Sequence, residues 1–207
     1  MSKKGYIALL HYYKMKGKVY VYLFRHGQTT YNRDKRFTGW NNPPLTAKGV
    51  VQAKILAKKL KNKKIQVAIH THLRRSKKTL QEVLKYHPEC TVLKKDDRMI
   101  ERNYGELNGT LHDSYIKEYG QELFDAIHRG YNTPPPKGES FAMVEKRVRI
   151  FIKDLIKLMK KKKVSVAISA HGNSIRLFRK IMENASVKQA VAWKIPYDKV
   201  FTYSIKV

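Results

Sequence analysis

Two apolar runs, each followed directly by His-Gly, constrain this chain most. The first run, 19–24, leads into Arg25-His26-Gly27, and the second, 164–170, leads into His171-Gly172. Continuous apolar runs rich in β-branched and aromatic residues are typical of buried strands in a parallel sheet. Because ligand sites in α/β proteins lie at the carboxyl ends of such strands, the two histidines are predicted to face one anion pocket.

The residues after the first run suit a phosphoryl group. Arg25 offers a planar fork of donors that matches two phosphate oxygens, and Gly27 lets a bulky anion approach the backbone. A neutral His26 between them could accept a phosphoryl group on a ring nitrogen. A histidine at a strand end is more often only a hydrogen-bonded side chain, so the triplet alone is weak evidence. The second His-Gly strengthens it, because Asn173 or Ser174 is predicted to cap a following helix whose amides add positive potential.

Strand and helix periodicities alternate along the rest of the chain. After Thr46, a predicted N-cap, apolar residues from Val50 to Leu60 recur at helical spacing, and a longer amphipathic helix is predicted from Ser140. The other expected elements are strands at 67–71 and 91–93, an edge strand at 200–207, and helices at 76–86, 113–119, 121–129 and 175–182. This alternation predicts an α/β protein, a three-layer α/β/α sandwich with a mostly parallel mixed sheet.

Length and composition favour a single domain. The 207 residues can bury one sizeable core, and no Pro-, Gly- or Ser-rich linker divides them. We expect one catalytic domain at 19–207, preceded by an N-terminal extension at 1–18 whose role the sequence leaves open. The extension has no apolar run long enough for a signal-peptide core, and no run in the chain reaches the roughly 18 residues of a membrane span. A cytoplasmic protein with no membrane partner is therefore expected.

A formal net charge of +28 is the most unusual bulk property. It could bind nucleic acid or an anionic membrane, attract acidic substrates, or reflect solvated, lysine-rich helix faces. Lysine runs at 58–64 and 160–163 lie where helices are predicted to end, and cations there complement the helix dipole. The runs lack the interleaved aromatic residues of single-strand-binding surfaces, so solvated helix ends are favoured over a nucleic-acid partner.

Several segments together match one known pattern. They are Arg25-His26-Gly27 with Asn32, the runs 36–40 and 44–49, Leu73 to Ser76 with Thr79, and the runs 100–109, 134–136, 138–140 and 171–176. On these segments the chain resembles the histidine phosphatase superfamily, and within it the cofactor-dependent phosphoglycerate mutases. The resemblance runs from about Tyr20 to the last predicted strand. It implies a phosphoglycerate mutase-like fold and interconversion of 3-phosphoglycerate and 2-phosphoglycerate in glycolysis and gluconeogenesis.

The resemblance also implies catalytic roles. His26 would attack in line and form a phosphohistidine, while its other ring nitrogen is held by a backbone carbonyl within the first motif. Arg25, Arg75 and His171 would surround the phosphoryl oxygens and neutralise their charge. Glu101 would give a proton to the leaving alkoxide and later take one back. From the residues alone, Glu101 could instead merely pair with a neighbouring arginine, but the surrounding motif favours catalysis.

Substrate-binding residues follow from the same resemblance: Asn32, Thr38, Gly39, Arg102, Tyr104, His112, His128, Arg129, Gly172 and Asn173. Two of them depart from the family pattern, since His112 stands where the family has a lysine and His128 where it has an arginine. Histidine is mostly neutral at pH 7, so both changes weaken a fixed positive charge. The implied cofactor is 2,3-bisphosphoglycerate as priming phosphoryl donor. No metal is implied, and the His, Asp and Glu spacings show no metal cage.

These departures keep other functions open. A histidine phosphatase would use the same catalytic residues and let water accept the phosphoryl group. The run 37–40 and Asn173 resemble mutase signatures and favour the mutase. A basic nucleic-acid-binding protein on a degenerate enzyme fold is a weaker alternative, because all five catalytic positions are intact. A small phosphorylated substrate is the expected partner, and homo-oligomer formation stays open.

Overall fold

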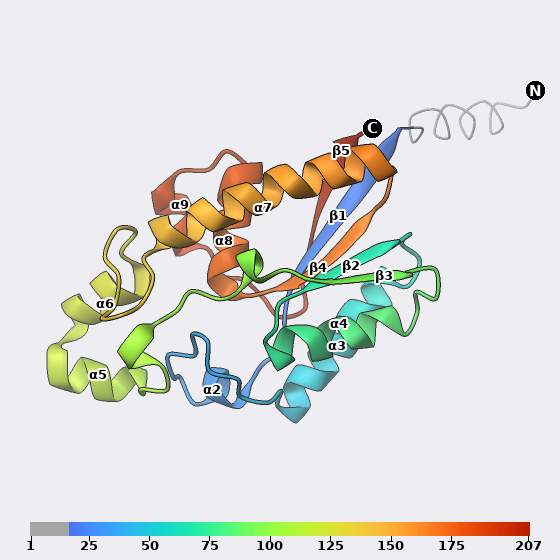
Figure 1. The fold of residues 1–207 in the computed structure, drawn as a ribbon. Coiled ribbons are helices and arrows are strands. Elements are labelled where there is room, and N and C mark those ends of the chain that lie inside the picture. Colours follow the sequence, from blue (N-terminus) through green and yellow to red (C-terminus); the bar gives the residue numbers. More distant parts are fainter. Residues whose placement is uncertain (1–16) are drawn as a thin grey trace, which may run out of the picture.

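A five-stranded mixed sheet forms the middle layer of the protein (Figure 1). The computed structural model describes residues 17–207. The strands are β1 Lys18–Arg25, β2 Val67–His70, β3 Val92–Lys95, β4 Val166–Ala170 and β5 Val200–Lys206. Their order is β3-β2-β4-β1-β5; β5 runs antiparallel to β1, and the other neighbours are parallel. The predicted mixed, mostly parallel sheet is confirmed.

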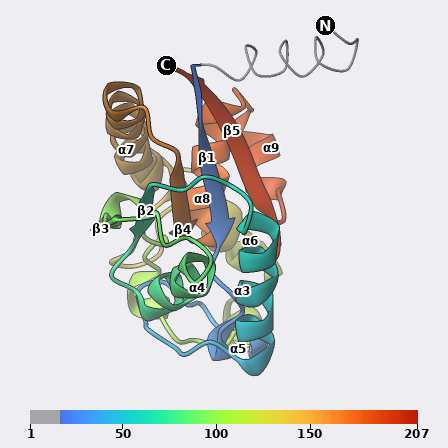
Figure 2. The same cartoon turned by 90° about the vertical axis from the view of Figure 1, so that its right-hand side faces the viewer.

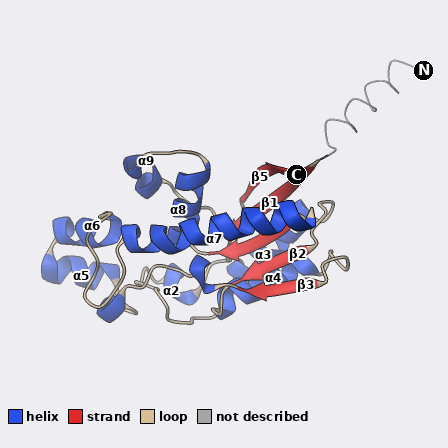
Figure 3. Cartoon of the chain, turned by 45° about the horizontal axis from the view of Figure 1, so that its top comes forward, coloured by secondary structure: helices blue, strands red, loops and turns tan. Residues whose placement is uncertain are grey.

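Helices cover both faces of this sheet, as the turned views show (Figures 2 and 3). Successive side chains of β1 alternate between the two layers, because a strand has a side-chain period of two. Leu23 lies in the core cluster formed with two helices, α7 (Phe141–Lys162) and α8 (Gly172–Met182), whereas Phe24 lies in the cluster formed with α3 (Ala47–Leu60) and α4 (Arg74–Leu84). The three-layer α/β/α sandwich is therefore confirmed; β2 and β4 are buried on both faces and β1 nearly so, whereas the edge strands β3 and β5 are more exposed.

The helices begin and end close to the predicted positions. They are α2 Thr30–Arg33, α3 Ala47–Leu60, α4 Arg74–Leu84, α5 His112–Tyr119, α6 Gln121–Arg129, α7 Phe141–Lys162, α8 Gly172–Met182 and α9 Val187–Ala192, with short 3₁₀ turns η1 Asp97–Met99 and η2 Gly105–Leu107. Thr46 and Ser140 cap α3 and α7 as predicted, each side chain accepting a backbone amide. Both lysine runs lie at helix ends, those of α3 and α7.

Four details of the prediction need correction. Val50 was expected in the buried stripe of α3, but it is 37% exposed because Gly49 and Ala53 take the inward positions. Asn173 and Ser174 lie inside α8 rather than at its N-cap, since that helix already begins at Gly172 after His171 as N-cap; Ser174 Oγ accepts the His171 amide from within the first turn. The short helices α2 and α9 carry too few apolar residues for a periodic signal and were not predicted.

The predicted N-terminal extension lies almost wholly outside the described residues. Of residues 1–18 the structure describes Gly17 and Lys18, and Lys18 is already the first residue of β1. No helix in the described part of the chain is long and apolar enough to cross a membrane.

Helices α5 and α6 form a small unit beyond the carboxyl ends of β1 and β4 (Figure 1). It is joined to the rest by a separate aromatic cluster of Phe37, Tyr104, Tyr115 and Phe124. Phe37 lies within 4.8 Å of the Tyr104 ring and 5.7 Å of the Phe124 ring, measured between centroids. The loop after β1 is thereby packed against the segment that carries residues 104–128.

Two glycines let the loop after β1 lie against the start of α3. A Cβ on Gly27 would collide with the Gly49 carbonyl oxygen, and a Cβ on Gly49 would collide with the Gln28 carbonyl oxygen. The Gly27 amide donates to Thr79 Oγ1 of α4 at 3.0 Å, which fixes the loop from the other side. The position of His26 therefore depends on a backbone contact that only glycine permits.

We expect Gly49→Ala to destabilise the protein by about 1–3 kcal/mol, because the added methyl group meets backbone rather than a movable side chain. Urea denaturation measures the change. The matched control is Lys54→Ala on the same helix, whose side chain is exposed. Equal stabilities for the two variants would contradict the role of this backbone contact.

Candidate active site

The two predicted histidines meet at the carboxyl ends of neighbouring parallel strands. Arg25 of β1 pairs in register with Ala170 of β4, and the His26 amide donates to the Ala170 carbonyl oxygen at 3.1 Å. The rings of His26 and His171 consequently lie 5.1 Å apart between centroids. The structure thus brings together the two His-Gly segments, although 144 residues separate them in sequence.

The His26 ring is held in one tautomer. Its Nδ1 lies 2.7 Å from the Gly27 carbonyl oxygen, which can only accept, so Nδ1 carries the proton. Nε2 is then unprotonated and has its lone pair free. Burial, together with the charges of Arg75 and Arg25, holds the pKa of His26 well below its usual range. His26 is therefore neutral at pH 7 with an Nε2 that suits a nucleophile, and the backbone carbonyl expected from the first motif is present.

His171 is held from behind by Thr71, whose Oγ1 lies 2.8 Å from His171 Nε2. The ring is fully buried, and its Nδ1 has no hydrogen-bond partner among the described residues. Burial, with Arg75 and His26 nearby, holds the pKa of His171 well below its usual range. This imidazole can donate or accept one hydrogen bond at Nδ1 without carrying a charge.

Backbone carbonyls hold the arginines of the site. Arg75 donates to the carbonyl oxygens of Gly39 and Asn41 at 2.8 and 2.7 Å, and Arg25 donates to that of Ile195 at 3.1 Å. The Nε atoms of both arginines are buried and unpartnered within the described chain. Burial lowers the pKa of Arg75 to about 10, so it stays protonated at pH 7. Both guanidiniums keep their charge and have donors left for an anion.

Glu101 is placed by two backbone amides. Its Oε1 accepts from the amides of Arg102 at 2.8 Å and Asn173 at 3.0 Å, while Trp40 Nε1 and Arg147 donate to its carbonyl oxygen. The side chain is 7% exposed and lines the cavity. Within residues 17–207 Glu101 makes no ion pair with Arg98 or Arg102, since Arg98 pairs with Asp96 and Asp154 and the Arg102 guanidinium donates to carbonyl oxygens of α6.

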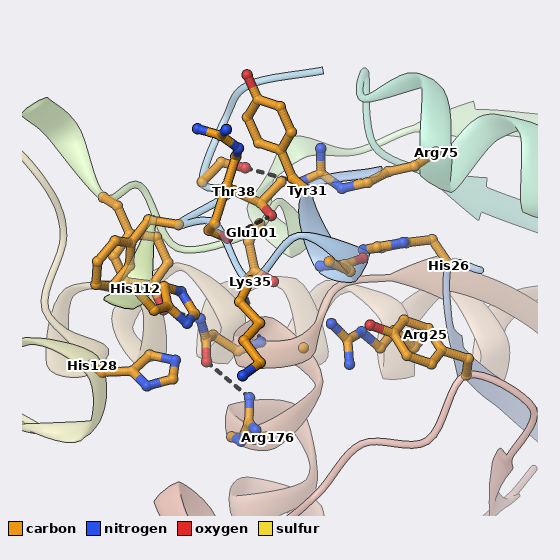
Figure 4. Close-up of a pocket in the computed structure, with 18 of the residues that line it drawn as sticks. Arg25, His26, Tyr31, Lys35, Thr38, Arg75, Glu101, His112, His128 and Arg176 are labelled. Atoms are coloured by element: carbon orange, nitrogen blue, oxygen red, sulfur yellow. Dashed lines mark hydrogen bonds between the residues drawn. The ribbon is translucent and has the colours of Figure 1, made fainter. Parts of the chain in front are cut away.

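These groups surround a cavity of about 230 Å³ (Figure 4). Its lining includes all but two of the predicted site residues, namely Arg25, His26, Asn32, Thr38, Gly39, Arg75, Glu101, Tyr104, His112, His128, Arg129, Gly172 and Asn173. The catalytic candidates lie at the sheet end of the cavity, and His112 and His128 lie at the other end (Figure 4).

The two exceptions lie behind the wall. His171 packs against the ring of His26, which itself lines the cavity. Arg102 is fully buried and donates to the carbonyl oxygens of Ile127 and His128 at 2.9 and 3.2 Å, with its guanidinium 4.4 Å from the Tyr104 ring centroid. Arg102 therefore holds the carboxyl end of α6 in place, and its direct contact with a substrate stays a prediction.

Sequence reasoning missed other residues of the lining: Tyr31, Lys35, Arg36, Phe37, Arg176 and Tyr197. The sequence does contain a signal for Arg176. It lies on α8 one turn after the His-Gly segment, so the two share the same end of that helix. It donates to Asn173 Oδ1 at 2.9 Å and to the Trp193 carbonyl oxygen at 2.9 Å. Burial and the nearby Arg129 and Arg25 lower its pKa to about 9. Lys35 had no signal, since it lies in an irregular turn.

His112 and His128 are neutral at pH 7. Their rings lie 5.2 Å apart between centroids, and both pack against Phe37 and Phe124. Burial, together with the charge of Arg129, lowers the pKa of His112 to about 4 and that of His128 to about 2. The weaker positive charge expected at these two positions is therefore confirmed.

Comparison with known proteins agrees with this geometry. The family model of the histidine phosphatase superfamily (branch 1) matches residues 21–206. The chain belongs to the histidine phosphatase superfamily. A 2,3-bisphosphoglycerate-dependent phosphoglycerate mutase of Nitrobacter winogradskyi is 33% identical over 174 residues, covering 82% of this chain and 84% of the relative. A phosphoglycerate mutase of Schizosaccharomyces pombe is 34% identical over 182 residues, covering 84% of this chain and 86% of the relative.

A solved structure shares the fold at lower identity. The mycobacterial glucosyl-3-phosphoglycerate phosphatase superposes with a TM-score of 0.76 at 21% identity, covering 90% of both chains. Members of the superfamily with the same fold are thus named both as mutases and as phosphatases. The fold alone leaves the specific reaction undecided.

This superfamily site can bind and transfer a phosphoryl group. It combines a neutral imidazole with a free Nε2, guanidiniums with free donors beside it, and a carboxylate on the cavity wall. A phosphoryl group carries three oxygens, and buried donors aimed at them act most strongly where water is excluded. The arrangement therefore favours nucleophilic attack by His26 on phosphorus.

We expect the free energy of unfolding to fall as the pH is lowered from 7 to 5. In the unfolded chain the pKa of a histidine returns to about 6.5, whereas in the folded chain it is about 4 for His112 and about 2 for His128. The unfolded chain thus binds more protons, so stability is fully present above about pH 6.5 and is lost below it.

His128→Gln should make this decline shallower, by up to about 1.4 kcal/mol per pH unit, because one of the excluded protonation sites is removed. Urea denaturation at pH 7, 6 and 5 measures the slope. His72→Gln, at an exposed histidine, is the matched control. Parallel curves for wild type and His128→Gln would contradict this explanation.

Proposed function

We propose that the protein is a 2,3-bisphosphoglycerate-dependent phosphoglycerate mutase that interconverts 3-phosphoglycerate and 2-phosphoglycerate in the cytoplasm, in glycolysis and gluconeogenesis. The observation that carries the proposal is the His26–Glu101 pair in a cavity with six cationic side chains and one carboxylate: Arg25, Lys35, Arg36, Arg75, Arg129 and Arg176 against Glu101. A substrate with both a phosphate and a carboxylate matches this excess of positive charge. The named relatives support it.

In the proposed reaction His26 Nε2 attacks phosphorus in line with the ester oxygen. The N–P bond forms as the P–O bond breaks, and the bonding electrons leave with the ester oxygen. Donors of Arg25 and Arg75 stabilise the phosphoryl oxygens during the transfer, and His171 packs against the His26 ring from behind the cavity wall. Because His26 Nδ1–H donates to the Gly27 carbonyl, the ring keeps its orientation as positive charge develops on it.

Glu101 supplies and removes the proton. Its carboxyl group protonates the leaving alkoxide, and the carboxylate then accepts the proton of the hydroxyl group that attacks the phosphohistidine. The amides of Arg102 and Asn173 hold Oε1, so Oε2 is the oxygen left for this transfer. A substrate that can present either of two neighbouring hydroxyl groups would give isomerisation.

The cavity suits 2,3-bisphosphoglycerate as the priming cofactor. When bound, it supplies the phosphoryl group that first loads His26. Arg25 and Arg75 would hold the phosphate that lies at His26, while Arg129 and Arg176 lie further along the lining for a second anionic group. The buried, unpartnered donors of Arg25 and Arg75 fit such a polyanion.

Phosphatase activity is the second candidate, and the neutral His112 and His128 favour it. Weak binding of the glycerate intermediate at that end of the cavity would let the glycerate leave. Water would then take its place and accept the phosphoryl group. The phosphatase named among the structural neighbours has the same fold. The two candidates share every step up to phosphorylation of His26.

A coupled enolase assay on 3-phosphoglycerate, with and without catalytic 2,3-bisphosphoglycerate, distinguishes them when free phosphate is followed in parallel. The enzyme is treated with EDTA before the assay and the chelator is removed, because enolase itself needs magnesium. We expect isomerisation stimulated by the bisphosphate, with little phosphate released and no loss after EDTA. Phosphate release without isomerisation would replace the mutase proposal with the phosphatase. Activity lost after EDTA would reject a metal-free reaction.

His26→Ala should abolish incorporation of acid-labile phosphate from 2,3-bisphosphoglycerate, because no other buried histidine presents an unprotonated Nε2 to the described cavity. Labelled protein is measured after acid and after alkali treatment. His70→Ala is the matched control: its Nδ1 also lies close to the next carbonyl oxygen, at 2.6 Å, but it does not line the cavity. Labelling retained in His26→Ala would remove His26 as the nucleophile.

A further inference from the structure

At the far end of the cavity, α6 supplies one cation, Arg129, for the second anionic group of a substrate. His112 and His128 form that wall and are neutral, and Phe37 packs against both. Arg102 is turned behind the wall to the α6 carbonyls. A second cation for a carboxylate lying there comes from another element.

Lys35 lies where such a cation is needed. It is the only lysine in the lining of the cavity, and Figure 4 shows its side chain pointing into the cavity toward the side of Arg176 and His128. Its charge is close enough to His112 to contribute to the lowered pKa of that imidazole. These two observations place the Lys35 ammonium at the solvent-exposed mouth of the distal wall.

The backbone of Lys35 is fixed in an uncommon conformation. Its φ is 51°, in the left-handed region that few residues other than glycine and asparagine adopt. Its carbonyl oxygen accepts the His112 amide at 2.9 Å, and the next residue, Arg36, forms a β-bridge with Leu111. The turn is therefore tied to the start of α5, and a lysine is kept where a glycine or asparagine would be less strained.

No acidic residue competes for this ammonium. Within the described part of the chain, no carboxylate forms an ion pair with Lys35, whereas the neighbouring Arg33 pairs with Asp34. The one carboxylate of the lining, Glu101, is held by backbone amides at the other end of the reaction site. The charge of Lys35 is thus available to a ligand.

We propose that Lys35 determines substrate specificity by binding the carboxylate of the substrate, at the wall that His112 and His128 leave uncharged. The proposal deepens the proposed function and rests on it, because it selects phosphate esters that carry a second anionic group. A flexible ammonium on the loop after β1 then adds to the Arg129 charge on α6. Phosphoryl transfer itself, at His26, does not involve Lys35.

Two ligands that differ only at this group test the proposal: 3-phosphoglycerate, and glycerol 3-phosphate, which has a hydroxymethyl group in place of the carboxylate. Their dissociation constants are measured by calorimetry on unphosphorylated wild type, Lys35→Met, Lys35→Arg and Lys117→Met. Lys117 is an exposed lysine of α5 outside the lining, so its variant makes the same change in net charge.

We expect Lys35→Met to bind 3-phosphoglycerate about tenfold more weakly, the usual size of a lost charge-assisted contact, with glycerol 3-phosphate unchanged within about twofold. Lys35→Arg should keep most of the preference, and Lys117→Met all of it. Equal losses for both ligands, no loss for either, or a wild type that does not prefer the carboxylate would overturn the proposal. Binding needs no turnover, so failure of the mutase assay is a separate result.

Discussion

The structure of this site depends on buried guanidiniums that are held by carbonyl oxygens instead of carboxylates. Arg25, Arg75, Arg102 and Arg176 each donate to backbone oxygens of loops or helix ends. A carbonyl satisfies a donor and orients the side chain without cancelling its charge. Positive potential therefore remains in a desolvated cavity, at a cost in self-repulsion that a bound polyanion removes. Burial first, and this repulsion second, lower the pKa values of Arg75 and Arg176.

The positive potential of these arginines also explains why the histidines of the site are neutral. Burial and the neighbouring arginines both disfavour an imidazolium at His26 and His171, so the rings stay neutral where a nucleophile and a hydrogen-bonding group are needed. The carbonyl of Gly27 then selects the tautomer of His26. The register of the sheet, the hydrogen bonds that hold the arginines and the tautomer of His26 together determine the state of the site. Gly27 and Gly49 allow the close backbone approach on which this arrangement depends.

The sequence predicted the sheet, its long helices and the phosphoryl end of the cavity, because strand runs, N-caps and His-Gly endings are local signals. It could not place Arg102, whose direction is decided by the α6 carbonyls, residues distant in sequence. Nor could it find Lys35, whose position follows from a left-handed turn tied to the His112 amide. Both depend on tertiary contacts that no periodicity records. The prediction that Val50 is buried was wrong for a related reason. Gly49 must face Gln28, and this contact sets the rotation of α3 so that Val50 points outward.

The cavity therefore has two ends that are held separately. The phosphoryl end is built from β1, β4, α4 and α8, whose backbone hydrogen bonds fix it from several directions. The distal end is carried by α5 and α6, which join the sandwich mainly through the Phe37 cluster and the Lys35 turn. In the proposed enzyme, the neutral histidines at positions 112 and 128 affect how the organic part of a substrate is held, while His26 is fixed by the sheet end. On this proposal, the balance between isomerisation and hydrolysis is set at the distal end.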